Sequence, residues 1–209
     1  MSSNMEINTI EIAGLGAALT ALRLPFGKEV RSRIEHSCET HVDFADIDME
    51  KTEDSYEVTM KGHLRFTSNA HIVIEPKDIT LMQTLVKRGD EHAKAIRGVV
   101  AYAQTTAPIY WWRELETYRA GHERLSSEST MHIDCRGLSG EELQRAKAEI
   151  PMGHSCTCMD MFSYQCLRNI IKQRHNHRLP EWHTFIDWIH TLPLADELIF
   201  VGLEEQEDR

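Results

Sequence analysis

The sequence predicts an α+β fold, with strands near the N-terminus and helices dominating the C-terminal half. Before residue 75, short segments alternate apolar and polar residues, which is typical of strands. From Pro76 onwards, apolar residues recur mostly at helical spacing. The 209 residues are 41% hydrophobic and 27% charged, a globular balance that predicts a single domain over residues 1–209.

The N-terminal half is expected to hold three strands and one helix. Alternation predicts strands at Ile7–Ile12, Tyr56–Met60 and His71–Ile74. Gly14–Leu24 is expected to be helical, and the helix is expected to end at Pro25 and Gly27. Arg31–Asp54 is polar with weak periodicity, so a long loop is expected there.

In the middle of the chain, the spacing of apolar residues changes from one typical of strands to one typical of helices. Pro76–Ala103 has apolar residues at helical spacing, which predicts one or two helices. Ala107–Arg119 is rich in aromatic residues and is expected to form a helix or a strand–helix junction. Leu125–Thr130 contains three serines and is expected to be a turn.

Three more helices are predicted towards the C-terminus. Ser139-Gly-Glu-Glu142 has the pattern of a capping box, which starts a helix that runs to Ile150. Asp160–Asn176 carries an apolar stripe and is expected to be the second helix, and Pro180 opens the third. The charged tail Glu204–Arg209 is expected to fray.

The charge and the termini exclude some classes of protein. A net charge of -10 argues against non-specific binding of a nucleic-acid polymer, since that binding depends on Lys and Arg. No apolar run approaches the roughly 20 residues of a membrane helix, and Met1–Ile10 lacks a secretion pattern. We therefore expect a cytoplasmic protein without a membrane anchor, whose five cysteines are free thiols.

A metal site is not predicted. His154, Cys156 and Cys158 alternate with single residues, whereas zinc sites usually show two ligand pairs at Cys-x-x-Cys-like spacing.

Three segments, in order along the chain, carry a family resemblance. In the first, an Ala-Pro-Ile stretch leads into Arg113-Glu114 and then into Thr117-Tyr118-Arg119. The second is Ser126–His132, and the third is Lys147–Arg174, which contains Ile150-Pro151. These segments resemble the flavin-dependent thymidylate synthases, and in particular a phage-associated branch of thymidylate synthase complementing proteins. The resemblance covers roughly residues 70–200.

The chain departs from the family pattern at several positions. Where the family has an Arg-His-Arg triplet, only Arg119 is basic, and Glu114 stands in place of a glutamine. Ser129 matches the motif serine, but Met131 replaces the following arginine and His132 replaces a tyrosine. In the third segment, Ser163 and Gln165 replace an Asn and an Arg.

The resemblance implies a fold, an assembly and a reaction. The fold is a twisted, mostly antiparallel sheet packed against long helices, in a homotetramer whose active sites lie between subunits. The reaction is the reductive methylation of dUMP to dTMP. FAD carries reducing equivalents from NADPH, and methylenetetrahydrofolate supplies the carbon.

The matched positions assign roles to six residues. Arg174 would contact the pyrimidine edge as the catalytic residue. Ser129, Lys147 and Glu114 would contact the nucleotide, and Arg119 and Asn169 would contact the flavin.

Each of these residues also has a structural interpretation. Arg174 and Lys147 lie near predicted helix C-termini, where the helix dipole favours cations. Arg113 and Arg119 lie in an aromatic segment, where arginine commonly stacks on Trp or Tyr. Ser129 belongs to a serine-rich segment that is typical of turns and N-caps.

Two other functions stay open. One is a related hydroxymethylase of dUMP or dCMP that serves modified phage DNA. The other is a flavinless paralogue that binds a nucleotide without catalysis. The altered triplet and Met131 leave room for both.

Overall fold

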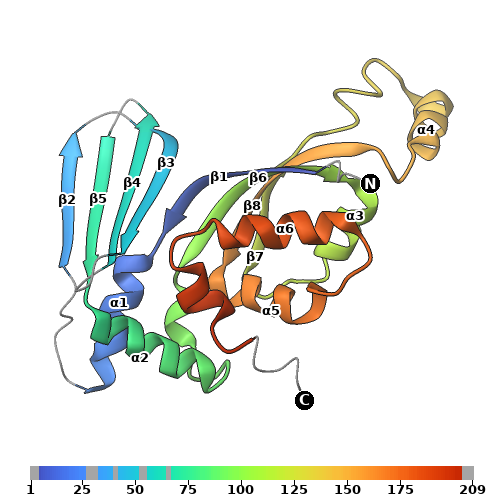
Figure 1. Cartoon of the computed structure of the whole chain (residues 1–209). Helices are drawn as coiled ribbons and strands as arrows, with labels where there is room; N and C mark the ends of the chain where they lie inside the picture. The colour runs from blue at the N-terminus through green and yellow to red at the C-terminus, as the bar shows by residue number, and fades with distance from the viewer. Residues whose placement is uncertain (1–4, 27–32, 40–41, 52–55, 65–66, 204–209) are drawn as a thin grey trace.

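The computed structural model describes residues 5–26, 33–39, 42–51, 56–64 and 67–203. In this part of the chain two antiparallel sheets and several helices form an α+β architecture (Figure 1). The tail Glu204–Arg209, expected to fray, lies outside the described residues.

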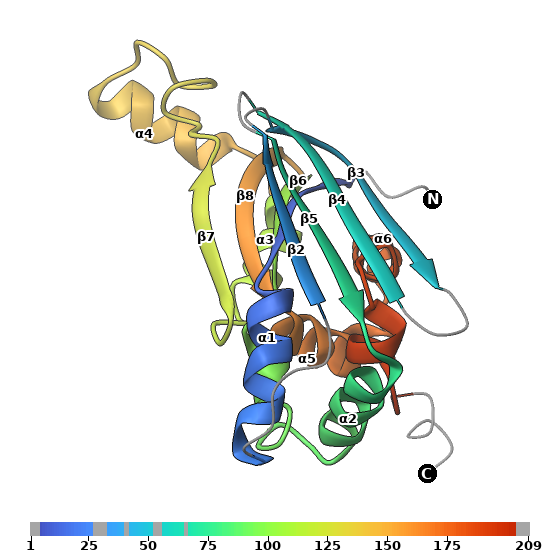
Figure 2. The same cartoon turned by 90° about the vertical axis from the view of Figure 1, so that its left-hand side faces the viewer.

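The central sheet has four strands in the order β1-β6-β8-β7. Its strands come from distant parts of the sequence and pair antiparallel throughout: β1 (Glu6–Ala13), β6 (Val100–Pro108), β8 (Ser155–Ser163) and β7 (His122–Ser127). The second sheet follows the order β2-β5-β4-β3 and is also antiparallel. It comprises β2 (Arg33–Glu39), β3 (Val42–Lys51), β4 (Tyr56–Leu64) and β5 (Thr67–Ile74). Figure 2 looks onto this second sheet, with α1 and α2 at one end of it.

The described residues form six α-helices of seven to twelve residues each. They are α1 (Leu15–Arg23), α2 (Pro76–Lys87), α3 (Ile109–Leu115), α4 (Gly140–Glu149), α5 (Tyr164–Arg174) and α6 (Pro180–His190). Short helical turns follow at η1 (Leu24–Phe26), η2 (Lys94–Arg97) and η3 (Asp196–Phe200). Among the described residues, no helix is both long and apolar enough to cross a membrane.

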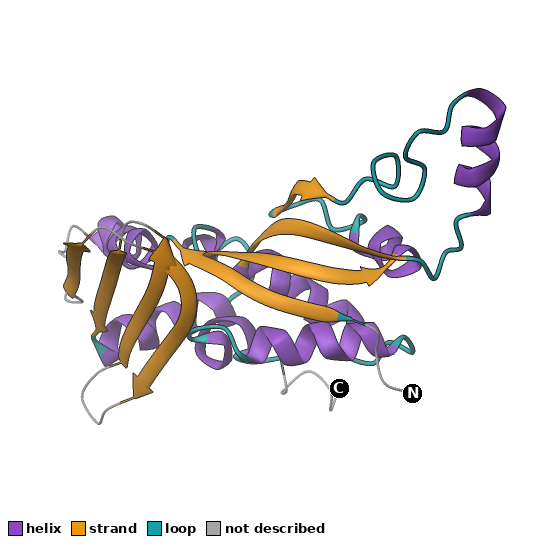
Figure 3. Cartoon of the chain, turned by 90° about the horizontal axis from the view of Figure 1, so that it is seen from above, coloured by secondary structure: helices purple, strands orange, loops and turns teal. Residues whose placement is uncertain are grey.

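The core lies between the central sheet and the helices on one of its faces (Figure 3). Small buried residues on β6, such as Ala101 and Ala103, leave room for large aromatic side chains. Phe162 of β8 meets Phe185 of α6 edge to face, with ring centroids 5.5 Å apart. Trp111 of α3 contacts Phe185 at 5.4 Å, so one aromatic cluster joins sheet and helices.

The predicted fold class is confirmed, and so are most of the predicted elements. The strands expected at Ile7–Ile12, Tyr56–Met60 and His71–Ile74 lie within β1, β4 and β5. The helices expected at Gly14–Leu24 and from Pro180 are α1 and α6. The expected strand–helix junction is the passage from β6 to α3, and the helix predicted after Ser139 is α4.

The loop predicted for Arg31–Asp54 is wrong, because β2 and β3 occupy most of it. Polar and apolar residues alternate along β3, but its many acidic residues obscure this pattern. Ile47 and Met49 nevertheless pair in register with Met60 and Val58 of β4. Pairing with neighbouring strands therefore determines that this segment forms strands, and such pairing cannot be read from the local sequence.

Three predicted helical or turn segments are partly strands. Pro76–Ala103 was expected to be helical, but it ends in η2 and the start of β6, where Val100 and Ala103 continue the helical spacing of Ile96 and Val99 by coincidence. Leu125–Ser127 continues β7 instead of starting a turn. The helix expected from Asp160 begins only at Tyr164, because Asp160–Ser163 pairs with β6 and Ser163 caps α5.

Residues 128–154 form an arm that extends away from the two sheets and carries α4 (Figures 1 and 3). None of the residues of α4 is buried. Four large apolar side chains of the arm are exposed: Met131 (45%), Ile133 (60%), Leu138 (38%) and Met152 (44%). An arm that buries so little apolar surface is a candidate for contact with another chain.

Candidate functional site

The candidate site is centred on Arg174, the last residue of α5. Its Nη1 donates to Glu114 Oε2 at 3.0 Å, and its Nε donates to Tyr118 Oη at 2.8 Å. The guanidinium lies over the ring of Trp182, with Cζ 4.8 Å from the centroid. Arg174 is therefore held in place by the end of α3, the turn after it, and the start of α6.

Glu114 is the hub of this cluster. Its Oε2 also accepts a hydrogen bond from Trp182 Nε1 at 3.0 Å, and it lies 3.4 Å from His177 Nε2. Two charged or polar donors on one carboxylate oxygen fix its orientation beside Arg174. The sequence assigned Glu114 and Arg174 to the same ligand, and the structure brings them together as an ion pair.

Arg174 keeps hydrogen-bonding capacity for a ligand. Among the described residues, no group accepts a hydrogen bond from its Nη2, and its side chain is 20% exposed. A partly exposed guanidinium next to a fixed carboxylate offers donors and acceptors side by side. This arrangement suits the edge of a pyrimidine base, which itself alternates donors and acceptors.

A second group of predicted residues lies in the arm. Lys147 of α4 donates from Nζ to Thr130 Oγ1, next to Ser129. The Ser129 carbonyl accepts from the backbone N–H groups of His132 at 2.9 Å and Ile133 at 3.1 Å, which closes a tight turn. Ser129 and Lys147 are thus brought close together, as their shared assignment to the nucleotide requires. A cation beside hydroxyl groups can bind a phosphate.

The arm group and Arg174 lie apart within one chain. The arm carries α4 away from the sheets, whereas α5 packs beneath the central sheet (Figure 1). No described contact joins Ser129 or Lys147 to Arg174 or Glu114. The residues predicted to bind the nucleotide therefore form two separate groups within one chain.

The two residues assigned to a flavin are also separate from one another. Arg119 is exposed and borders an open pocket of about 340 Å³, lined by Glu116, Tyr118, Arg119, His122, Glu123 and Arg124. Asn169 accepts through Oδ1 from Gln165 Nε2 at 3.3 Å, and the same amide donates to Asp90 Oδ1 at 3.1 Å. No described contact joins Asn169 to Arg119.

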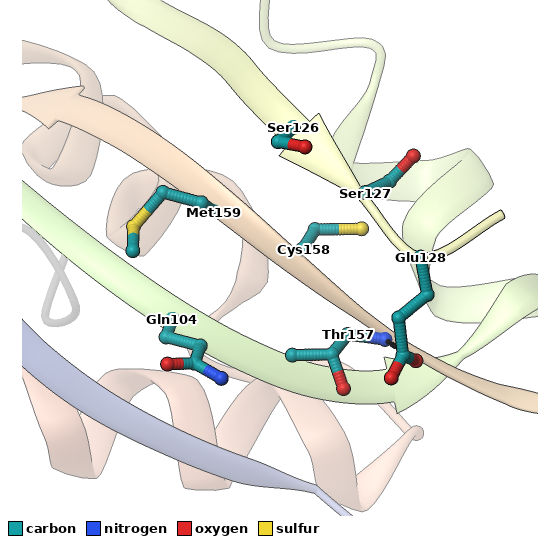
Figure 4. Close-up of a pocket in the computed structure, with 7 residues that line it drawn as sticks. All are labelled: Gln104, Ser126, Ser127, Glu128, Thr157, Cys158 and Met159. Atoms are coloured by element: carbon teal, nitrogen blue, oxygen red, sulfur yellow. Dashed lines mark hydrogen bonds between the residues drawn. The ribbon is translucent and has the colours of Figure 1, made fainter.

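A further pocket, of about 350 Å³, lies at the end of β7 and β8 (Figure 4). It is lined by Gln104, Ser126, Ser127, Glu128, Thr157, Cys158 and Met159. Glu128 Oε2 accepts from the backbone N–H of Thr157 at 2.6 Å, which fixes this carboxylate at the rim. Burial raises the pKa of Cys158 to about 12 and also raises the pKa of Cys156, so neither thiol is poised as a nucleophile.

The described residues hold no group of three or more His, Cys, Asp or Glu side chains that could bind a metal.

A buried polar network that no sequence pattern predicted lies beside the candidate site. His122 Nε2 lies 2.8 Å from Asp160 Oδ1, and Arg124 Nε donates to the same oxygen at 3.1 Å. Arg124 Nη1 also donates to Glu116 Oε1 at 2.8 Å. Sequence alone gave no signal, because Asp160 was expected in a helix and lies 38 residues from His122.

Comparison with known proteins identifies the fold. No protein-family model matches the chain, and no curated protein sequence does. Among solved structures, thymidylate synthase X (ThyX) from Helicobacter pylori with FAD and dUMP superposes with a TM-score of 0.62 at 11% identity, covering 95% of this chain and 98% of that one. A second structure of this flavin-dependent enzyme with FAD and dUMP gives 0.61 at 12% identity, covering 93% and 97%.

The UMP/dUMP methylase PolB from Streptomyces cacaoi, bound with 5-Br UMP, is also similar. Its TM-score is 0.56 at 11% identity, and the match covers 96% of each chain. The chain therefore has the fold of the flavin-dependent thymidylate synthases and of PolB.

Proposed function

We propose that this chain is an enzyme that binds a pyrimidine deoxynucleotide and catalyses the reductive methylation of dUMP to dTMP. The observation that carries the proposal is the geometry at Arg174. Solved structures with this fold contain dUMP. Arg174 stands where the family resemblance places an arginine that binds the pyrimidine. Glu114 and Tyr118 hold its side chain, and its Nη2 has no acceptor among the described residues. Arg174 would donate to the base, and Glu114 would fix it in that orientation.

The phosphate of the nucleotide would bind at the arm. Lys147 supplies the charge, and Ser129 and Thr130 supply hydroxyl groups. Because the arm and Arg174 lie apart in one chain, the complete site would form between two copies. The exposed apolar residues of the arm support such an interface.

A flavin would be held by Arg119 and Asn169, and it would supply the redox chemistry. The residues present fit this role in part. Arg119 is an exposed cation at the edge of an open pocket, and Asn169 offers an amide. Thr117 Oγ1, however, donates to the Glu114 carbonyl at 2.7 Å, and Tyr118 Oη is engaged by Arg174. One cation thus serves where the family has three basic side chains, so we expect weaker FAD binding.

The co-substrates follow from the same proposal. NADPH would reduce the flavin, and methylenetetrahydrofolate would supply the carbon. No thiol nucleophile is needed for this chemistry, which agrees with the raised pKa of Cys158.

The test is complementation of a thymidine-requiring strain that lacks thymidylate synthase. Growth without thymidine that depends on Arg174 supports the proposal, and the Arg174→Ala variant is the control. If growth fails, the purified chain should be incubated with FAD, NADPH, methylenetetrahydrofolate and either dUMP or dCMP. A hydroxymethylated product would establish the hydroxymethylase instead. A colourless protein that binds dUMP, gains no flavin absorbance and makes no product would establish the non-catalytic paralogue.

A further inference from the structure

His122, the first residue of β7, is buried and makes contact on three sides. Its ring stacks on Phe162, with centroids 4.7 Å apart and planes 5° from parallel. Its Nδ1 lies 3.2 Å from the Tyr118 carbonyl oxygen, and its Nε2 lies 2.8 Å from Asp160 Oδ1. The histidine thus bridges the turn after α3 and the central strand β8.

Both hydrogen-bond partners of the ring are acceptors. A backbone carbonyl can only accept, so Nδ1 must carry a proton. Arg124 Nε donates to Asp160 Oδ1 at 3.1 Å, which favours the ionised carboxylate, so Nε2 must carry a proton as well. A neutral ring would turn a lone pair towards one of these oxygens inside the protein, at a cost in free energy. The geometry therefore favours an imidazolium.

An imidazolium at His122 would balance the charges of the network that it joins. Arg124 bridges Asp160 and Glu116, so the connected network holds two carboxylates and one guanidinium besides His122. Burial alone would lower the pKa of Arg124, but the charges of Asp160 and Glu116 and the hydrogen bond to Asp160 raise it above its ordinary value. The remaining charged groups that border the same pocket are Arg119 and Glu123.

The turn that His122 holds carries residues of the proposed site. Tyr118 accepts from Arg174 Nε through its hydroxyl and donates to Gln173 Oε1 at 3.1 Å. Arg119 follows directly. The far end of the turn is also fixed, because the Gly121 carbonyl accepts from Ser163 N–H at 2.7 Å. Gly121 has φ of 81°, and a Cβ there would lie 2.2 Å from Ser163 Oγ, so no other residue fits without movement.

We propose that doubly protonated His122 is a positioning residue, which ties the Tyr118 carbonyl to Asp160 and thereby holds Tyr118 in contact with Arg174 and fixes the backbone that leads to Arg119. The assignment of the ligand rests on the proposed function. The charge state of His122 does not, because it follows from the contacts within the chain. The proposal predicts that ligand binding weakens when the two ring hydrogen bonds of His122 are removed.

The charge state is tested first, by NMR of the histidine ring nitrogens in the full chain at neutral pH. His122→Gln identifies its signals by their disappearance. Two protonated ring nitrogens are expected, and Asp160→Asn should convert the ring to a neutral form. One protonated and one bare nitrogen in the wild-type chain would overturn the proposal.

The positioning role is tested by titrating dUMP into the wild-type chain and its variants. His122→Phe keeps the stack on Phe162 but loses both ring hydrogen bonds, so it should bind dUMP about tenfold more weakly than wild type. His122→Gln, which can still donate one of these hydrogen bonds, should recover part of the lost affinity. His92→Phe is the control, because His92 is 47% exposed and its ring pairs with Glu91, outside the His122 network.

The outcomes separate the two proposals. If His122→Phe and wild type bind dUMP with equal affinity, the positioning role is wrong while nucleotide binding stands. If neither the wild type nor any variant binds dUMP, the proposed function fails, and the NMR result still decides the state of His122. Thermal melts accompany each titration, and His122→Gln replaces His122→Phe if the latter does not fold.

Discussion

Arg174 has a structural role and a proposed ligand role, and the two can be separated by measurement. Replacing Arg174 by Ala removes one partly exposed ion pair, the hydrogen bond to Tyr118 and the cation–π contacts with Trp182 and Tyr118, which together stabilise the fold by about 1 to 2 kcal/mol. If its free nitrogen also binds the base, dUMP affinity should fall by about 1.5 to 3 kcal/mol. Calorimetric titration of dUMP alongside thermal melts measures both.

Arg113→Ala is the matched control for this variant. Arg113 lies next to Glu114 on the exposed side of α3 and contacts only the sulfur of Met152 in the described part of the chain. Its removal changes the net charge equally but should leave dUMP affinity unchanged. Equal affinity of the Arg174→Ala and wild-type chains would remove Arg174 from the site.

Arg119 is expected to govern flavin binding. It is the one basic member of its triplet, and a charge-assisted hydrogen bond to a phosphate contributes about 1.5 to 3 kcal/mol. Arg119→Ala should therefore abolish an already weak FAD affinity, and Thr117→Arg should strengthen it. Quenching of flavin fluorescence reports both. Retention of FAD by Arg119→Ala at wild-type affinity would place the phosphate contacts elsewhere.

At the scale of residues, the family resemblance indicated which residues belong to the proposed site, but it did not predict which of their side chains contact one another. Arg174 and Glu114 were both assigned to the nucleotide, yet their ion pair joins residues 60 apart in sequence. The link from His122 to Asp160 was not predicted at all. Such pairs depend on which strands become neighbours, and β7 meets β8 only through the long excursion of the arm. No local pattern encodes that meeting.

At the scale of elements, the sequence predicted best where one face of a segment is buried. The helix from Pro180 was correct because its apolar stripe, with Trp182 and Phe185, faces the core. The loop expected at Arg31–Asp54 was wrong because cross-strand pairing, and not composition, makes β2 and β3. The start of α5 was misplaced because Asp160 and Phe162 fit both a helical stripe and a strand.

The arm should be an element of assembly. Ile133 is 60% exposed, and we expect it to be buried against another copy. Ile133→Lys should then dissociate the assembly and weaken dUMP binding, since an unpaired charge in an apolar interface is costly. Leu24→Lys is the control, because Leu24 is 69% exposed at the end of α1, away from the arm. Light scattering compares the two. Unchanged size for Ile133→Lys would mean that the arm makes no such contact.

At the scale of the whole molecule, assembly is the property that neither sequence pattern nor a single chain contains. The homotetramer remains a prediction from the family resemblance, with an expected mass of about four times 24.1 kDa. The separation of Lys147 from Arg174 within one chain is a structural argument for this predicted assembly. A site divided between an arm and a helix end is useful only if two copies bring the halves together.

Mixing two inactive variants tests this division directly. Lys147→Ala removes the proposed phosphate contact, and Arg174→Ala removes the base contact, so each homogeneous assembly should bind dUMP poorly. In a reassembled equal mixture, a site shared between two copies takes one half from each. About one quarter of the sites should then combine an intact arm with an intact Arg174.

The expected result is therefore recovery of about one quarter of the dUMP-binding capacity at wild-type affinity, measured by calorimetry after co-refolding. The matched control mixes wild type with the double variant Lys147→Ala, Arg174→Ala, which gives the same proportion of mutated groups. If each site forms within one chain, the mixture of single variants recovers nothing, because every chain lacks one half. That result would confine the nucleotide to a single copy and require the arm to bind another ligand.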